Sequence, residues 1–197
     1  MRILVVYCHP VPNSFGASLR DTVVQAARAA GHSVDLIDLY AEGFEPVMRE
    51  SERRSYHSDD LPASLPNRHV ERLRACDGVI LVYPTWWMSP PAMLKGWFDR
   101  IWRPGVAFAN AETLSGMKPL LTHIRLIFAV STLGAPWWYW TFVLRNPGRN
   151  VLLRSLKSCC NARCKTQWLS LHNMDSCSAA QRARFLSKVA KQVSDIR

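Results

Sequence analysis

Unusual polar and aromatic residues gather in three short segments, residues 8–16, 84–91 and 131–136. Each segment directly follows a run of β-branched and apolar residues. If those runs are parallel strands, the three segments meet at one edge of a sheet, where ligands bind in open α/β folds. The first segment contains neither G-x-G-x-x-G nor G-x-x-x-x-G-K-[ST], which disfavours a standard dinucleotide fingerprint and a P-loop NTPase. The spacing therefore predicts a shared ligand site of another kind.

The first segment places polar residues directly before a predicted helix: His9, Asn13, Ser14 and Gly16. Backbone N–H groups at the start of a helix, together with a hydroxyl and an imidazole, can bind a phosphate without any lysine. The alternative is that Asn13 or Ser14 only caps the helix and that His9 is a surface residue. This segment by itself favours neither interpretation.

The second segment carries Trp86 and Trp87 at the same predicted edge. Loop indoles suit a flat heteroaromatic ring, which can stack on them while backbone amides bond its rim. Alternatively, the two indoles pack the loop onto the helix that follows. Trp97 and Trp102 occur at helical spacing, and we expect them in the core.

The third segment offers the hydroxyls of Ser131 and Thr132 and the small Gly134, past which a ring could approach the backbone closely. Four aromatic residues follow at 137–140. Clustered Trp and Tyr side chains are typical of a lid or a subunit contact. They could instead line a substrate cavity.

Strands and helices alternate along the rest of the chain. We expect strands at 2–7, 33–39, 77–83, 124–130 and 164–171, and helices at 17–30, 67–76, 92–102 and 178–196. Asn67 and Ser178 are predicted N-caps, Gly31 is a predicted helix stop, and 61–66 is a predicted loop. This alternation predicts an α/β fold with a parallel sheet wound on both faces. With no repeat or linker, residues 1–197 form one predicted domain.

The composition is that of an ordinary globular protein, with 197 residues of which 48% are hydrophobic. No apolar run has the length of a membrane span, and the first residues lack the pattern of a signal peptide, so we expect a cytoplasmic protein. Cys159, Cys160 and Cys164 form a cluster, but the pairs or histidines that structural zinc requires are missing. We therefore expect no metal and no disulfides.

Positive charge is concentrated near the end of the sequence. Residues 143–197 hold 11 Lys/Arg against 2 Asp/Glu, whereas residues 1–142 hold 14 against 13. Clustered basic residues attract phosphates, but no nucleic-acid-binding motif accompanies them, and we expect no nucleic-acid partner. A field that attracts an anionic cofactor or partner is the preferred interpretation.

Specific motifs run through the predicted site. They are His9-Pro10-x-Pro12-x-Ser14-Phe15, Asp38-Leu39-Tyr40, Pro84-Thr85-Trp86-Trp87 with Pro91-Ala92-Met93-Leu94-Lys95-Gly96-Trp97-Phe98-Asp99-Arg100, Pro104-Gly105-Val106-Ala107-Phe108, and Ser131-Thr132-Leu133-Gly134-Ala135-Pro136. In these motifs, residues 1 to about 140 resemble the NAD(P)H:quinone oxidoreductase family of flavodoxin-like flavoproteins. That family includes bacterial quinone reductases and ancillary proteins of glutathione-gated potassium efflux.

The resemblance implies a flavodoxin-like sheet of five parallel strands in the order 2-1-3-4-5, with helices on both faces. It also implies a flavin site. His9, Ser14 and Phe15 would hold the phosphate and ribityl end, Pro84, Thr85, Trp86 and Trp87 the isoalloxazine, and Ser131, Thr132 and Gly134 its pyrimidine edge. Asn13, Gly16 and Leu133 complete the set of candidate cofactor residues. The family often has Asn where Gly16 stands, and Gly or an aromatic residue where Leu133 stands.

The implied activity is two-electron (hydride) reduction of a quinone or similar electrophile by NAD(P)H, in a ping-pong sequence on non-covalent FMN or FAD. The protein's part is to position the flavin and to tune its electrostatics. Tyr139 is the candidate proton donor to the acceptor, and a homodimer is expected. One alternative is a flavin-binding regulatory subunit that docks on a membrane transporter through residues 143–197 and the aromatic run at 137–140. A second alternative, a one-electron carrier, would need an acidic docking face, whereas the charge balance of this sequence is basic. A flavin-free structural protein would leave the three segments unexplained.

Overall fold

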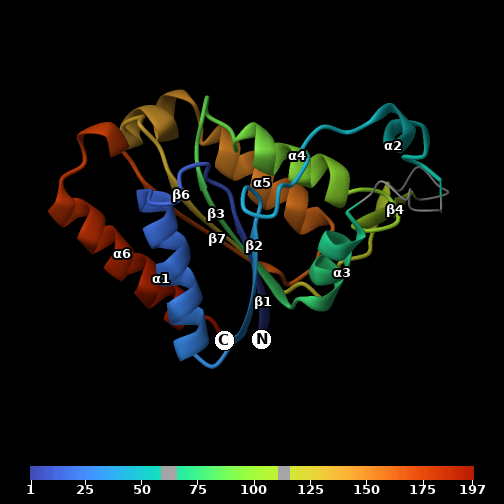
Figure 1. The fold of residues 1–197 in the computed structure, drawn as a ribbon, viewed down its shortest axis with the longest axis horizontal. Coiled ribbons are helices and arrows are strands. Elements are labelled where there is room, and N and C mark those ends of the chain that lie inside the picture. Colours follow the sequence, from blue (N-terminus) through green and yellow to red (C-terminus); the bar gives the residue numbers. More distant parts are fainter. Residues whose placement is uncertain (59–65, 111–115) are drawn as a thin grey trace.

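Five parallel strands form the central sheet of the computed structural model, which describes residues 1–58, 66–110 and 116–197 (Figure 1). In chain order the strands are β1 (Arg2–Tyr7), β2 (Ser33–Asp38), β3 (Gly78–Pro84), β6 (Leu126–Thr132) and β7 (Lys165–Leu171). Their order across the sheet is β2-β1-β3-β6-β7. The expected five-stranded order 2-1-3-4-5 is confirmed, because β4 and β5 belong to a separate two-stranded ribbon.

The central strands are buried on both faces, as their continuous apolar sequences predict. Their register brings the ends of β3 and β6 level, with Pro84 opposite Thr132, and β1 ends at Tyr7, opposite Val82, two residues before the end of β3. The three segments that follow β1, β3 and β6 therefore leave the sheet at a common edge, the upper edge in Figure 1.

Helices cover both faces of the sheet (Figure 1). On one face lie α1 (Phe15–Ala29) and α6 (Ala179–Ser194), and on the other α3 (Asn67–Ala75), α4 (Ala92–Ile101) and α5 (Pro147–Ser158). Their apolar stripes form two cores, one centred on residues such as Val23 and Val189, the other on residues such as Leu73 and Trp97. Trp97 is fully buried and Trp102 nearly so, which confirms that both are core residues.

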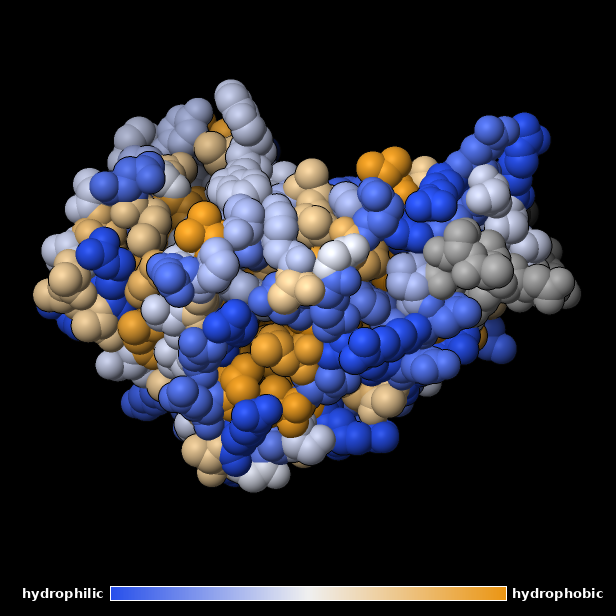
Figure 2. All heavy atoms as spheres, viewed as in Figure 1, coloured by the Kyte–Doolittle hydropathy of each residue, from blue (hydrophilic) through white to orange (hydrophobic). Residues whose placement is uncertain are grey.

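Smaller elements complete the described part of the chain. These are α2 (Glu50–Arg54), the ribbon of β4 (Phe108–Asn110) and β5 (Met117–Pro119), a π-helical turn at Tyr139–Val143 and a 3₁₀ turn at Met174–Ser176. The face seen in Figure 2 is mostly hydrophilic, with a hydrophobic patch near its centre.

Two of the predicted helix ends are confirmed and one is wrong. Ser178 caps α6 by accepting the N–H of Gln181 at 3.2 Å, and Gly31 ends α1 with a φ of 81°. Asn67 is instead the first residue of α3, after Pro66, which supplies no side-chain cap. Predicted loop 61–66 lies, except for Pro66, outside the described residues.

The strand starts at 77 and 124 were predicted one and two residues too early. The Asp77 carboxylate accepts the N–H of Arg2 at 2.7 Å, so this residue closes the entry to the sheet instead of joining β3. Arg125 is exposed, and β6 begins only at Leu126. Charged residues thus mark the start of both strands.

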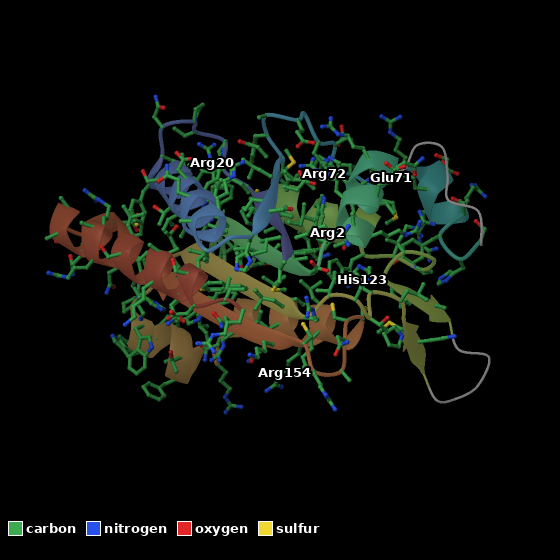
Figure 3. The ribbon with its side chains drawn as sticks, turned by 90° about the horizontal axis from the view of Figure 1, so that it is seen from below. Arg2, Arg20, Glu71, Arg72, His123 and Arg154 are labelled. Atoms are coloured by element: carbon green, nitrogen blue, oxygen red, sulfur yellow. The ribbon has the colours of Figure 1, made fainter. Side chains whose placement is uncertain are left out.

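Ionic contacts fasten helices of one layer to their surroundings. Arg100 of α4 and Glu52 of α2 are both almost fully buried and lie 2.5 Å apart. Arg72 of α3 joins Asp35 of β2 at 2.6 Å and Glu42 at 2.9 Å, and Figure 3 labels its position. The Arg72 guanidinium accordingly lowers the pKa of the Asp35 carboxyl.

All six cysteines are free thiols. In the parts of the chain that the structure describes, no group of three or more His, Cys, Asp and Glu side chains is arranged to hold a metal ion. Across those same parts, no helix is both long and apolar enough to cross a bilayer.

Candidate functional site

The segments after β3 and β6 are joined directly to each other. The backbone N–H of Thr85 donates to the carbonyl of Thr132 at 2.7 Å, and the hydroxyls of Thr85 and Ser131 lie 2.7 Å apart. The joined segments border an open cleft of ≈ 420 Å³, which lies within the usual size range of small-molecule sites. The lining residues are Thr85, Trp86, Trp87, Met88, Leu133, Gly134 and Ala135.

A tight turn forms one wall of this cleft. Trp86 and Ser89 exchange two backbone hydrogen bonds of 3.0 Å, and the central residues Trp87 and Met88 have φ values of 47° and 60°. Two positive φ values are the signature of a type I′ turn, which residues other than Gly, Asn and Asp adopt at a cost. The Trp87 side chain is 97% exposed, so it does not pack the loop onto the following helix. The strained turn holds this indole at the rim of the cleft.

The opposite wall is clamped from β7. Leu133 donates its N–H to Leu171 at 2.9 Å and accepts the N–H of Met174 at 3.1 Å, and its side chain is buried. Leu133 therefore borders the cleft mainly as a structural residue. Gly134 is exposed, and a Cβ built on it would lie 2.7 Å from Oδ2 of Asp175. Glycine thus allows a carboxylate to approach this wall closely.

A histidine supports the same wall. His172 Nδ1 lies 3.2 Å from the carbonyl of Ala135, and its Nε2 lies 2.9 Å from the hydroxyl of Ser170. Since a carbonyl only accepts, Nδ1 carries the proton and Nε2 accepts from Ser170. Burial lowers the pKa of His172, which keeps the ring neutral. Within the described residues, the N–H groups of Gly134 and Ala135 have no protein acceptor and can bond a ligand edge.

The first segment reaches the cleft through one side chain. His9 and Trp86 have ring centroids 6.4 Å apart, and His9 also covers Gly16, whose Cβ would lie 3.3 Å from Cδ2 of that ring. Ser14 is the N-cap of α1, with its hydroxyl accepting the N–H of Ala17 at 3.2 Å. Ser14 therefore caps α1 through its side chain.

The remaining predicted residues of this segment lie around the start of α1. Asn13 is exposed, and Phe15 is the first helical residue and packs partly against the core. The Ser14 hydroxyl also lies 3.4 Å from that of Tyr7, whose pKa is raised by burial. The amides of Phe15 and Gly16 form the first turn of a helix that starts at the edge holding the cleft.

The aromatic run lies beside the cleft and not in its lining. Trp140 is buried, while Trp137, Trp138 and Phe142 are more than half exposed. Tyr139 is half-buried in the π-helical turn, edge-on to Trp138, and does not border the cleft. Pro84 is buried at the end of β3.

Four residues of the site were not among the candidate site residues predicted from the sequence: Met88, Ala135, His172 and Asp175. Met88 and Ala135 lie within the predicted segments, but only the Trp86–Ser89 turn and the backbone hydrogen bonds of Leu133 place them at the cleft. His172 and Asp175 come from the segment after β7, which leaves the sheet at the same edge as the other three. Counting every strand end, including the last, would have found them.

The sequence is similar to those of known oxidoreductases. A protein from Escherichia coli, "Uncharacterized NAD(P)H oxidoreductase YcaK", is 36% identical over 115 residues, 57% of this chain and 58% of the relative. The aligned region is thus less than two thirds of that relative's length.

Two solved structures share the fold. The "NAD(P)H:quinone oxidoreductase from Methanothermobacter marburgensis" superposes with a TM-score of 0.81 at 22% identity, covering 99% of this chain and 95% of the other. An "FMN-dependent NADH-azoreductase" from Bacillus anthracis, solved with FMN, has a TM-score of 0.78 at 14% identity, with coverage of 98% and 97%. The family model of the flavodoxin-like fold matches residues 1–195. The chain therefore belongs to the flavodoxin-like fold family.

Proposed function

We propose that this protein is a flavin-dependent NAD(P)H oxidoreductase that reduces quinones or similar electrophiles by two electrons. The observation that carries the proposal is the cleft at the ends of β3 and β6, whose two walls are joined by Thr85. The name of the E. coli relative supports NAD(P)H as the reductant, and that of the Methanothermobacter enzyme supports a quinone as the acceptor.

The residues of the cleft fit a flavin. The N–H groups of Gly134 and Ala135, which have no acceptor among the described residues, match a ring edge rich in acceptors, and the exposed Trp87 offers a flat surface beside it. The amides of Phe15 and Gly16, with Ser14 and His9, would hold the phosphate at the start of α1. The FMN complex of the Bacillus protein, which has the same fold, supports FMN as the cofactor.

A bound flavin would supply the chemistry, carrying two electrons from NAD(P)H to the acceptor. The chain would bind its ring through the third segment, keep one face open beside Trp87, and set its electrostatics. The ping-pong order is proposed because one open cleft would serve both the reductant and the acceptor. Tyr139 is proposed as a proton donor only for an acceptor that extends beyond the cleft toward the π-helical turn.

Assembly belongs to the same proposal. Trp137, Trp138 and Phe142 form an exposed aromatic surface beside the cleft, the composition typical of subunit contacts. We propose a homodimer in which this surface is covered. Nothing in the arrangement of the basic residues favours docking on a membrane transporter over this simpler use of an apolar surface.

Blocking the cleft tests the proposal. FMN binding is measured by the change in flavin fluorescence, and activity by quinone-dependent oxidation of NADPH. Gly134→Trp fills the cleft and should abolish both, whereas Ala162→Trp, at an exposed position before β7 and outside the cleft, should leave both unchanged. Unaltered FMN binding in Gly134→Trp would place the flavin elsewhere and overturn the assignment.

A further inference from the structure

A second pocket, of ≈ 390 Å³, lies at the edge of the parallel sheet that β7 forms. α5 and α6, which cover opposite faces of the sheet (Figure 1), each contribute a cation to its lining, Arg149 from α5 and Lys188 from α6. We call this space the cationic pocket. None of the described residues that line the cleft also lines the cationic pocket, so the two are separate spaces.

The charge of the cationic pocket is positive only. The described part of its lining contains no carboxylate, and neither Arg149 nor Lys188 forms an ion pair with a described residue. The two acidic residues of the basic stretch 143–197 lie elsewhere, Asp175 against the cleft wall and Asp195 in a groove at the other end of the strands. Two cations without local carboxylates attract an anion.

Neutral donors accompany the cations. The indole N–H groups of Trp140 and Trp168 are buried and have no acceptor among the described residues, whereas unpaired buried donors are rare in folded proteins. Both indoles belong to the lining, as do the hydroxyl of Thr141 and the amide of Asn146, which makes no side-chain cap to α5. Arg, Lys and such neutral donors are the groups that bind phosphate oxygens.

One histidine joins the cationic pocket to the cleft. His172 lines the pocket, and its Nδ1 lies 3.2 Å from the carbonyl of Ala135, a residue that lines the cleft. Adjacent strands lie about 4.8 Å apart, so the pocket past β7 begins about one strand spacing from the cleft wall at the end of β6. A ligand in the cleft can therefore place an anionic group in the pocket if a short spacer, such as a sugar, connects the two.

We propose that the cationic pocket binds the pyrophosphate of NAD(P)H while the nicotinamide lies in the cleft. This inference rests on the proposed function, which supplies the reductant. One ribose separates the nicotinamide from the pyrophosphate, and the two negative charges of the pyrophosphate match Arg149 and Lys188. Because NADH and NADPH share this group, the pocket serves both.

The order of the strands separates this pocket from the phosphate of the flavin. The proposed flavin phosphate site is at the start of α1, which follows β1, whereas the cationic pocket lies past β7. The cleft at the ends of β3 and β6 is between them. The phosphates of the two nucleotides would therefore extend from the cleft in opposite directions, without repelling each other.

ADP-ribose, which carries the pyrophosphate but no nicotinamide, tests the pocket by titration calorimetry with and without added FMN. Arg149→Gln and Lys188→Gln should each raise its Kd about five-fold, and added salt should weaken binding to the wild type. Arg154→Gln on α5 and Lys191→Gln on α6 lie outside the pocket and should bind ADP-ribose normally. All four side chains are exposed, so the variants should fold like the wild type.

Steady-state kinetics test the link to the cleft. Dihydronicotinamide riboside is a matched reductant without phosphates. In the double variant Arg149→Gln/Lys188→Gln, the ratio of the KM for NADH to the KM for the riboside should rise about ten-fold. The protein is used in the assembly that it forms in solution, because Trp137 lines the pocket and also belongs to the proposed subunit contact.

Three results would overturn the proposal. They are a wild type that binds no ADP-ribose, equal affinities in the wild type and both pocket variants, and a loss of FAD binding with FMN binding retained in those variants. The last would assign the pocket to the AMP half of FAD. If binding of ADP-ribose requires both cations but NADPH does not reduce the flavin, the proposed oxidoreductase function falls and the pyrophosphate site stands.

Discussion

Thr85 and Thr132 are joined by a backbone hydrogen bond of 2.7 Å that links the segment after β3 to the end of β6. Beside it, the Thr85 hydroxyl lies 2.7 Å from that of Ser131. These two contacts make the cleft one unit, because neither wall can move without stretching a short hydrogen bond. The proposed flavin site depends on this pair of walls.

Removing the Thr85 hydroxyl should loosen the cleft while the fold persists. Thr85→Val keeps the shape and the backbone bond but loses the contact with Ser131, at a cost of about 1 kcal/mol. We expect the Kd for FMN, measured by fluorescence titration, to rise about five-fold. Thr166→Val, at the far end of the sheet on β7, is the matched control and should bind FMN normally. Equal affinities in both variants would show that the hydroxyl pair does not shape the site.

Replacing Trp87 by glycine should stabilise the fold. Its φ of 47° costs about 1–2 kcal/mol for an L-residue, and its exposed side chain contributes little packing. Trp87→Gly should therefore raise the free energy of unfolding in urea by about 0.5 kcal/mol, because the greater entropy of glycine in the unfolded chain offsets part of the relieved strain. The same variant should weaken FMN binding or quinone turnover.

Trp86→Gly is the control for that effect. Trp86 is hydrogen-bonded within the turn and is not at a positive φ, so its replacement should lower stability. A loss of stability in Trp87→Gly as large as in Trp86→Gly would contradict the strained-turn description.

The buried pair Arg100–Glu52 should matter most when only one partner is removed. Glu52→Ala leaves a guanidinium that is 4% exposed without its carboxylate, and we expect a loss of about 3–5 kcal/mol in urea unfolding. The double variant Glu52→Leu/Arg100→Met should lose much less. If the loss in the double variant equals the sum of the losses in Glu52→Leu and Arg100→Met, the two side chains are not coupled.

His69 should make the fold sensitive to acid. Trp97 donates to its Nδ1 at 3.0 Å, so Nε2 carries the proton and donates to Glu42 at 3.1 Å. Burial lowers the pKa of His69, which means that the unfolded chain takes up the proton at a higher pH than the folded one. Stability is therefore fully present above about pH 6.5 and falls as the pH drops below that value.

Linkage limits this loss to at most about 1 kcal/mol between pH 6.5 and 5.5, and urea unfolding at the two pH values measures it. His69→Gln should be less stable than the wild type at pH 7.5, with a smaller dependence on pH. Burial also lowers the pKa of His172, so some dependence in the same direction should persist in His69→Gln. An unchanged pH dependence in that variant would contradict the role assigned to His69.

Much of the fold follows from local signals in the sequence. Strand β1 and the Ser178 cap of α6 were predicted at their observed positions, because an uninterrupted apolar run and a Ser-x-x-Gln capping box are strong local signals. In contrast, α5 was not predicted. It begins after Asn146, which is in the left-handed region and makes no side-chain cap, and its surface carries several cations. Its burial against the sheet decides its structure, and tertiary contacts are not visible in a local pattern.

The candidate site shows the same division. The three segments were predicted from their position after buried strands, and the structure joins two of them at Thr85 and Ser131. The approach of Asp175 to Gly134 depends on the path of the chain after β7, which no local residue pattern predicts. The positive φ of Trp87 could not be predicted either, because type I′ turns are normally recognised by Asn or Gly at their central positions.

An anaerobic titration of the FMN-loaded protein with NADPH, followed by absorbance, shows whether the bound flavin takes electrons from NADPH and passes them to a quinone. We expect one equivalent of NADPH to bleach the bound flavin and one equivalent of a quinone to restore its colour. Bound FMN that NADPH leaves oxidised would contradict the proposed oxidoreductase.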